Sequence, residues 1–232
     1  MDIEKNPGLF CRQSGIITPD ELPAHIVLIG AGGIGSWTAL ALAKMGLKEI
    51  TIVDDDVIED ANIAPQFYRY ADMGKNKAEV LATRLYEEMG GGIKVNAIVS
   101  KWEDIKKDLR DELPMTADVL IMAVDLIDTR KMIWEDTKSS GYSLIIDGRM
   151  AKEMFQMYLI SPGNENHVKT FEKSLFSSEE AAEIPCTERA VAYNQFAIAG
   201  VIGAQIKQYA KNSILYKRIF LDLATMDIIL TQ

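Results

Sequence analysis

The amino-acid sequence predicts an α/β protein with a Rossmann-like, doubly wound and mostly parallel sheet that ends in antiparallel strands. Three observations lead to this fold class. From residue 25 onward, short apolar runs rich in β-branched residues alternate with helical segments. Most of these runs are apolar on both faces, as in strands that helices cover on both sides. After about residue 150 the alternation stops, and the chain ends in two further apolar runs separated by a turn.

Strands and helices are expected to alternate through the first half of the chain. The expected strands are 25–30, 49–54, 93–100, 118–124 and 143–147, and the expected helices are 34–45, 75–89, 103–109 and 126–139. Parallel strands need a crossover connection, which is usually a helix, so this order favours a parallel sheet.

The second half follows a different pattern. Residues 153–163 are expected to form a strand, and the polar residues 164–185 lack clear periodicity and are interpreted as a long loop. A long helix is expected over 188–211. Two antiparallel strands are expected within 216–232, with a turn near Ala224.

Length and composition fit one domain. The chain has 232 residues, of which 48% are hydrophobic, and this is enough to bury a core of ordinary density. We expect a single domain over 1–232, with an N-terminal arm (1–24) and a nucleotide-binding half (25–150). The remainder (151–232) would hold the crossover loop, the long helix and the C-terminal strands.

Composition also excludes several function classes. The formal net charge is −9 and is spread along the chain, which argues against a nucleic-acid surface. The two cysteines, Cys11 and Cys186, cannot form a disulfide framework or a four-cysteine zinc site, which favours a reducing, cytoplasmic setting. The N-terminus does not resemble a secretion signal, and the apolar stretch 190–206 is too polar to span a membrane.

A glycine loop is the first candidate binding motif. Gly30, Gly32 and Gly35, with the additional Gly33, follow an expected strand and open an expected helix. Free backbone N–H groups and the helix dipole favour phosphate at such a position. Proteins that bind NAD, FAD, S-adenosylmethionine or ATP all use this motif, so the loop alone does not identify its ligand.

An acidic cluster follows the second expected strand. Asp54 or Asp56 stands where a carboxylate would accept two hydrogen bonds from ribose hydroxyls. The alternative interpretation is a solvated turn. Three consecutive acidic residues are more than the binding of ribose requires. A dehydrogenase would also have no use for the segment that follows them.

Four motifs occur in a fixed order along the chain: GAGGIGS, DDDVIEDANIAPQ, GKNKAEV and AVDLIDTR. Taken together, they resemble the superfamily of ThiF, MoeB and the ubiquitin-activating enzymes. The resemblance covers most of the chain from residue 12 onward. It implies ATP-dependent adenylation of the C-terminal glycine of a ubiquitin-like or sulfur-carrier protein.

The resemblance also implies roles for individual residues near the nucleotide. Gly35 ends the loop beside the nucleotide, and Asp56, supported by Asp54, matches the acid that binds ribose. Asn62 and Gln66 match the residues that line the phosphate side.

Charged residues would complete the site. Lys77 matches the lysine that reaches the phosphates, and Asp125 matches the aspartate associated with Mg2+. Arg12 matches an arginine that reaches into the site of a partner subunit, which implies a homodimer. Without the resemblance, Lys77 reads as a solvated helix residue, Arg12 as a surface residue and Asp125 as a helix N-cap.

Two departures from the family pattern are expected to matter. Pro65 stands where the family commonly has an arginine, so one phosphate-binding cation is missing, and Arg69 is the candidate substitute. The paired CxxC motifs that hold a structural zinc in many relatives are absent, so we expect a zinc-free protein.

Cys186 lies in the segment EIPCTERA, before the long expected helix. Some relatives place a thioester-forming cysteine in a similar Cys-Thr setting, and a helix N-terminus lowers the pKa of a thiol. The alternative is a small buried apolar residue.

The sequence therefore predicts a cytoplasmic, homodimeric adenylyltransferase that uses ATP and Mg2+. Its expected partner is a small carrier protein that ends in glycine, and a thioester at Cys186 is a possible second step. Two alternatives stay open. One is an NAD-dependent Rossmann oxidoreductase, which leaves Asn62, Gln66, Lys77 and Asp125 without a task. The other is the non-catalytic subunit of a heterodimeric activating enzyme, which Pro65 favours.

Overall fold

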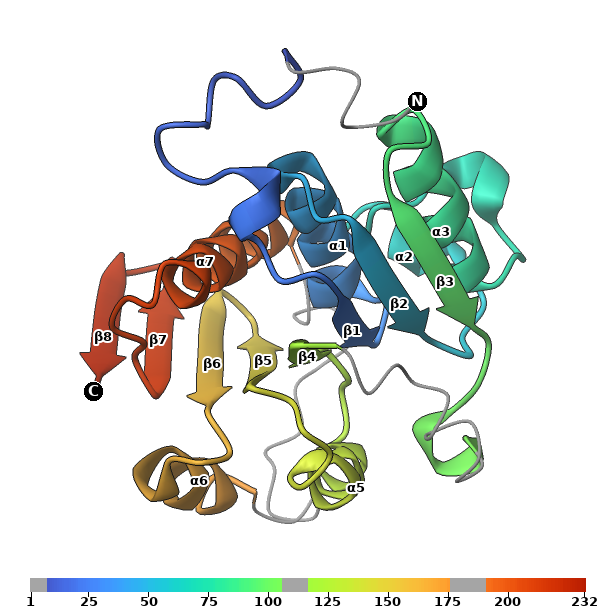
Figure 1. The fold of residues 1–232 in the computed structure, drawn as a ribbon. Helices are drawn as coiled ribbons and strands as arrows, with labels where there is room; N and C mark the ends of the chain where they lie inside the picture. Colours follow the sequence, from blue (N-terminus) through green and yellow to red (C-terminus); the bar gives the residue numbers. More distant parts are fainter. Residues whose placement is uncertain (1–7, 106–116, 176–190) are drawn as a thin grey trace.

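Apolar runs of the first half of the chain form five parallel strands of one eight-stranded sheet. In the computed structural model, which describes residues 8–105, 117–175 and 191–232, the sheet order is β3-β2-β1-β4-β5-β6-β7-β8. The parallel strands are β1 (Ile26–Ile29), β2 (Glu49–Val53), β3 (Lys94–Ile98), β4 (Val119–Met122) and β5 (Leu144–Ala151). The predicted parallel half is thereby confirmed (Figure 1).

The remaining strands are antiparallel, as predicted. They are β6 (Met154–Ile160), β7 (Arg218–Asp222) and β8 (Asp227–Thr231). The strand β5 continues past its predicted end at residue 147 because it pairs with β6 along a tight hairpin. Lys152, in the turn of this hairpin, has a φ of 55°.

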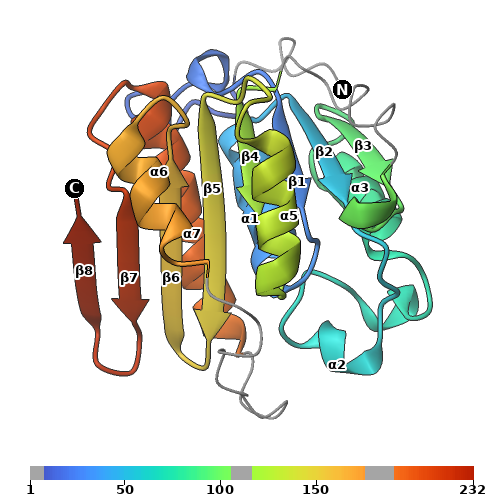
Figure 2. The same ribbon diagram turned by 90° about the horizontal axis from the view of Figure 1, so that it is seen from below.

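Helices cover both faces of the sheet (Figure 2). One face carries α1 (Gly33–Met45), α3 (Lys77–Glu88) and α7 (Ala192–Ala210), and the other carries α5 (Ile127–Thr137) and α6 (Glu165–Glu172).

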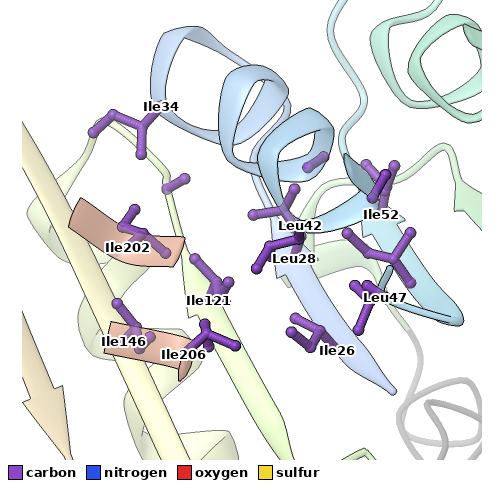
Figure 3. Packing of buried hydrophobic residues seen from close by; sticks show 14 of the residues in the cluster. Ile26, Leu28, Ile34, Leu42, Leu47, Ile52, Ile121, Ile146, Ile202 and Ile206 are labelled. Carbon is purple, nitrogen blue, oxygen red and sulfur yellow. The ribbon is translucent and has the colours of Figure 1, made fainter. Parts of the chain in front are cut away.

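Each buried strand contributes side chains to both apolar layers. In β1, Ile26 and Leu28 belong to the layer under α1 and α7, whereas Val27 and Ile29 belong to the layer under α5. Figure 3 shows the first layer, where strand residues pack against Leu42 of α1 and against Ile202 and Ile206 of α7. This two-faced burial explains why these strands read as continuous apolar runs.

The structure differs from the sequence prediction in its polar segments. Helix α6 lies inside the stretch predicted as a loop, and its N-cap, Asn164, accepts hydrogen bonds from the N–H groups of Asn166 and His167. A short helix, α2 (Asp60–Ile63), was not expected. Of the helix predicted at 103–109, the described part shows a 3-10 turn, η4 (Trp102–Asp104).

Two further short turns are η2 (Pro19–Glu21) and η3 (Tyr70–Asp72). Among the described residues, no helix combines the length and apolar character needed to cross a bilayer.

Candidate nucleotide site

The glycine loop and Asp125 follow two neighbouring strands. Residues 30–32 connect β1 to α1, and Asp125 lies between β4 and α5. From β1 the chain turns to β2 on one side, whereas β4 pairs with the opposite edge of β1. In open α/β sheets, ligands bind outside the carboxyl ends of the strands at such a reversal of strand order. The candidate site therefore lies between the ends of β1 and β4.

Gly30 and Gly35 fix the shape of the loop. Gly30 has a φ of 95°, and a Cβ on it would lie 2.5 Å from the carbonyl oxygen of Ala123, at the end of β4. A Cβ on Gly35 would lie 1.9 Å from the carbonyl oxygen of Gly30. Both positions require glycine because the backbones approach each other too closely for any side chain.

The first turn of α1 carries free N–H groups. Gly32 is the N-cap and has no side chain to accept a hydrogen bond. No described residue accepts a hydrogen bond from the backbone N–H groups of residues 32–35. Together with the positive end of the helix dipole, these groups make a place suited to phosphate.

Asp54 connects the end of β2 to the glycine loop. Its carboxylate accepts hydrogen bonds from the N–H of Ala31, at 2.6 Å, and from the N–H of Asp56, at 2.8 Å. Burial raises the pKa of the Asp54 carboxyl, and the two N–H donors oppose this rise. Both oxygens of Asp54 bind backbone N–H groups, so Asp54 holds the loop, whereas the Asp56 carboxylate is 64% exposed.

Asp56 and Lys77 form an ion pair beside the loop. The Lys77 Nζ lies 2.7 Å from Asp56 Oδ2, and 8% of the Lys77 side chain is exposed. Asn76, the N-cap of α3, donates to the backbone carbonyl oxygens of Asp54 and Asp56. Lys77 is therefore a buried, oriented cation and not a solvated helix residue.

Asn62 and Gln66 follow the acidic cluster through α2. Asn62 Oδ1 accepts from the N–H of Glu59 and caps this helix. Gln66 Nε2 lies 4.0 Å from the place that a Cβ on Gly32 would occupy, and the buried Oε1 of Gln66 has no partner among the described residues. Gln66 thus reaches the glycine loop, whereas Asn62 has a structural task of its own.

Pro65 belongs to an aromatic cluster. Its carbonyl oxygen accepts a hydrogen bond from Trp37 Nε1 at 3.0 Å. The Trp37 ring packs against Phe67 and, edge-on at 4.6 Å, against Phe196 of α7. This segment is therefore anchored to α1 by packing at the position where the resemblance expects an arginine.

Two arginines accompany this segment. Arg84 is buried, stands over the Phe67 ring at 4.0 Å and donates to the Phe67 carbonyl oxygen, and its burial lowers its pKa. The side chain of Arg69 is exposed, while its backbone N–H donates to Asp72. Arg84 is committed to packing, so Arg69 is the cation of this pair that remains available.

Asp125 is exposed at the end of β4, and Leu126, not Asp125, is the N-cap of α5. A buried network holds this corner. Arg130 donates to the carbonyl oxygen of Val124 and to Asp147, which is 0% exposed, and Arg149 Nε lies 2.6 Å from Asp147. Arg130 thus positions the backbone beside Asp125.

Two predicted residues are not brought to this chain's own loop. Arg12 is exposed in a turn whose neighbour Gln13 donates to the carbonyl oxygen of Met45, at the C-terminal end of α1. The glycine loop lies at the opposite end of this 13-residue helix, about 20 Å away. Cys186 lies outside the described residues.

Sequence reasoning missed several residues that shape the site. The Tyr68 hydroxyl donates to the carbonyl oxygens of Ala31 and Lys77, and so joins the loop to α3. Burial raises the pKa of Tyr68. Its only sequence signal is a place in the segment between Gln66 and Lys77. Gln195 of α7, which contacts Gly33, is visible in the sequence only as a polar interruption of the apolar stretch 190–206.

Comparison with known proteins gives one family. The profile of the ThiF family matches residues 22–220. Among curated relatives, the NEDD8-activating enzyme E1 catalytic subunit of Arabidopsis thaliana is 30% identical over 144 residues, covering 57% of this chain and 30% of the relative. The tRNA threonylcarbamoyladenosine dehydratase of Haemophilus influenzae is 33% identical over 140 residues, covering 57% of this chain and 52% of the relative. The chain thus matches about half or less of the length of these relatives.

A solved structure shares the fold. The crystal structure of E. coli MccB with AMPCPP and MccA superimposes with a TM-score of 0.74 at 24% identity. The match covers 98% of this chain and 72% of that chain.

Proposed function

Because the chain belongs to the ThiF family, we propose that it is an ATP-dependent adenylating enzyme that activates a C-terminal carboxylate. The proposed substrate is the terminal glycine of a ubiquitin-like or sulfur-carrier protein. The observation that carries the proposal is that the glycine loop, the Asp56–Lys77 pair and Asp125 follow the carboxyl ends of three neighbouring strands, β1, β2 and β4, around the reversal of strand order.

The nucleotide would bind through complementary charges. ATP carries about four negative charges at neutral pH, so a productive site needs donors and cations to bring a second anion to the α-phosphorus. Free N–H groups at residues 32–35 and the buried Lys77 supply such partners in an otherwise acidic protein. Asp56, 64% exposed, is accessible to ribose while it orients Lys77.

Asp125 is the candidate Mg2+ ligand. Mg2+ keeps several waters and binds through one or two carboxylates together with substrate phosphates, and an exposed carboxylate at the end of β4 fits this requirement. When bound there, the ion would neutralise phosphate charge. Arg130, through Val124, holds the backbone that presents Asp125.

The proposed reaction is a displacement at phosphorus. An oxygen of the terminal carboxylate attacks the α-phosphorus of ATP and forms the acyl-adenylate bond, and the bond from that phosphorus to pyrophosphate breaks. Pyrophosphate leaves with the electron pair. No proton transfer is needed, so the enzyme acts by positioning and charge neutralisation.

Two parts of the proposed function involve residues that lie outside the described site of a single chain. Arg12 would complete the site of a partner subunit in a homodimer, which fits its exposed place about one helix length from its own loop. Transfer to Cys186 would follow adenylation: the thiol gives up its proton to solvent, its sulfur attacks the carbonyl carbon of the acyl-adenylate, and AMP leaves with the electron pair of the broken acyl–phosphate bond. A thiol-sensitive conjugate that forms with ATP and is lost in Cys186→Ala supports this step, and its absence in the wild type refutes it.

Isotope exchange between pyrophosphate and ATP tests the function. Exchange is expected only with a carrier protein whose C-terminus is intact, and a carrier lacking its last two residues is the matched control. A panel of carriers and short peptides distinguishes protein from peptide substrates. No exchange with any substrate, together with tight binding of NAD, would favour the oxidoreductase alternative. No exchange and no nucleotide binding would favour the non-catalytic subunit.

Lys77→Ala is expected to abolish measurable exchange because the site loses its buried cation. Lys75→Ala is the matched control, since Lys75 is 60% exposed and pairs with Asp72 away from Asp56. Equal losses in both variants would contradict the role of Lys77. In the same assay, a normal rate for Arg69→Ala would exclude Arg69 as the substitute for the missing arginine.

A further inference from the structure

Gln195 is a buried amide without a hydrogen-bond partner. It lies in the first turns of α7 and is 0% exposed. Neither its Oε1 nor its Nε2 has a partner among the described residues. A buried polar group without a partner costs free energy, so native proteins rarely keep one without a reason.

The Gln195 amide faces the glycine loop. A Cβ on Gly33 would lie 3.1 Å from Gln195 Nε2 and 3.3 Å from its Cγ. Gly33 is the first residue of α1, in the turn whose N–H groups have no described acceptor. The unpaired amide of Gln195 and the unpaired N–H groups of the first turn of α1 therefore lie side by side.

The contact also accounts for the additional glycine of the loop. Gly30 and Gly35 are required by backbone contacts, but the space beside Gly33 is filled by the Gln195 side chain. A larger residue at position 33 would push this amide away. Gly33 thus serves contact with α7 and not the tight turn itself.

Neighbouring contacts hold Gln195 in place. Asn194 Nδ2 donates to the carbonyl oxygen of Lys152 at 2.8 Å, which ties the start of α7 to the β5–β6 turn. On the other side, the Phe196 ring packs against Trp37 of α1 at 4.6 Å. The amide is therefore presented to the loop by a fixed helix, and its terminal torsion is the freedom that remains.

We propose that Gln195 is a positioning residue for the nucleotide, acting through the glycine loop, and this inference rests on the proposed function. When phosphate binds, the first turn of α1 adjusts, and an N–H group of this turn that the phosphate leaves unused donates a hydrogen bond to Gln195 Oε1. Without nucleotide the amide is unpaired and destabilises the protein. Nucleotide binding removes this cost, so Gln195 strengthens binding of ATP without touching it.

Gln195→Met tests the inference, because methionine has the same reach and no hydrogen-bonding amide. ATP binding is measured by titration calorimetry with Mg2+ present, and thermal unfolding is measured without nucleotide. The Kd for ATP is expected to rise about tenfold, as for the loss of one or two hydrogen bonds. The Tm without nucleotide is expected to stay the same or to rise by about 2–6 °C.

Replacing a residue that only supports the structure would lower the Tm. A Tm that stays the same or rises, together with weaker ATP binding, therefore distinguishes a positioning residue from a structural one. In pyrophosphate exchange, the KM for ATP should rise while the maximal rate is kept. Gln205→Met is the matched control: Gln205 lies on the same helix, is 8% exposed and has an unpaired Oε1. It is two residues from Gly203, which faces Met45 at the far end of α1. Its Kd for ATP should stay unchanged.

A second pair of variants keeps the test independent of how Gln195→Met folds. Gly33→Ala should weaken ATP binding by displacing the amide, and in a Gln195→Ala background the same change should add little further loss. Additive losses would overturn the inference, as would an unchanged Kd in Gln195→Met. Failure of the wild type itself to bind ATP would instead overturn the proposed function on which the inference rests.

Discussion

Replacing Gly35 with alanine is expected to damage both the fold and the nucleotide site. The new Cβ would lie 1.9 Å from the carbonyl oxygen of Gly30, whereas ordinary contact begins near 3.4 Å. The obstacle is backbone and not a flexible side chain, so the start of α1 must move away from the end of β1. Overpacking of this kind costs about 3 kcal/mol. For a domain of this size, that corresponds to a decrease in Tm of about 6–12 °C.

Gly32→Ala is the matched control within the same loop. Its new Cβ would meet nothing closer than Gln66 Nε2 at 4.0 Å. Alanine is a poorer N-cap than glycine, which costs about 0.5–1 kcal/mol and lowers the Tm by about 1–4 °C. Thermal unfolding and ATP titration of the two variants give the comparison. If Gly35→Ala keeps the Tm and the ATP affinity of the wild type, the close approach of α1 to β1 is wrong.

Three more predictions concern the wider site. Burial raises the pKa of Asp54, so the folded protein binds this proton more tightly than the unfolded chain does. The free energy of unfolding of the wild type, relative to that of Asp54→Asn, should therefore fall as pH rises from below 3.8, the ordinary pKa, through the pKa of Asp54 in the folded protein. Urea unfolding of both proteins across this pH range measures the difference, and a difference that rises with pH would contradict the prediction. Asp147→Ala should lower the free energy of unfolding by about 3–5 kcal/mol, because two guanidinium groups lose their buried counter-ion. Asp20→Ala, which removes the exposed Asp20–Lys48 pair, should lower it by less than about 1 kcal/mol. Elemental analysis should give far less than one zinc ion per chain, and stoichiometric zinc would refute the expectation drawn from the missing CxxC motifs.

Regular apolar patterns made most of the fold predictable. The runs around Val27 and Leu120 are apolar on both faces because helices cover both sides of the sheet, and this requirement is visible in the sequence. Helix α6 was missed because its apolar side consists only of the buried Phe171 and the partly buried Val168, so its sequence resembles a loop. A strong pattern arises only where an element buries a full face.

The site was predictable only in part, for a similar reason. The position of Lys77 follows from an ordered motif, but the division of labour between Asp54 and Asp56 does not. It depends on which carboxylate meets the N–H of Ala31, and that contact joins segments from two strands. The partner of Gly33, Gln195, comes from a helix near the other end of the chain. Contacts of this kind depend on the packing of distant elements.

The sheet order also has a consequence for how the protein folds. Ile26 pairs with Ile50 on one side of β1 and with Val119 on the other, so the second pairing closes a much longer stretch of chain than the first. Closing a longer loop costs more conformational entropy, and contacts of high sequence separation form slowly. The ends of β1 and β4, which frame the candidate nucleotide site, are thus joined by the pairing that is hardest to make early. A newly made chain would form its glycine loop and first crossover before the candidate nucleotide site was assembled.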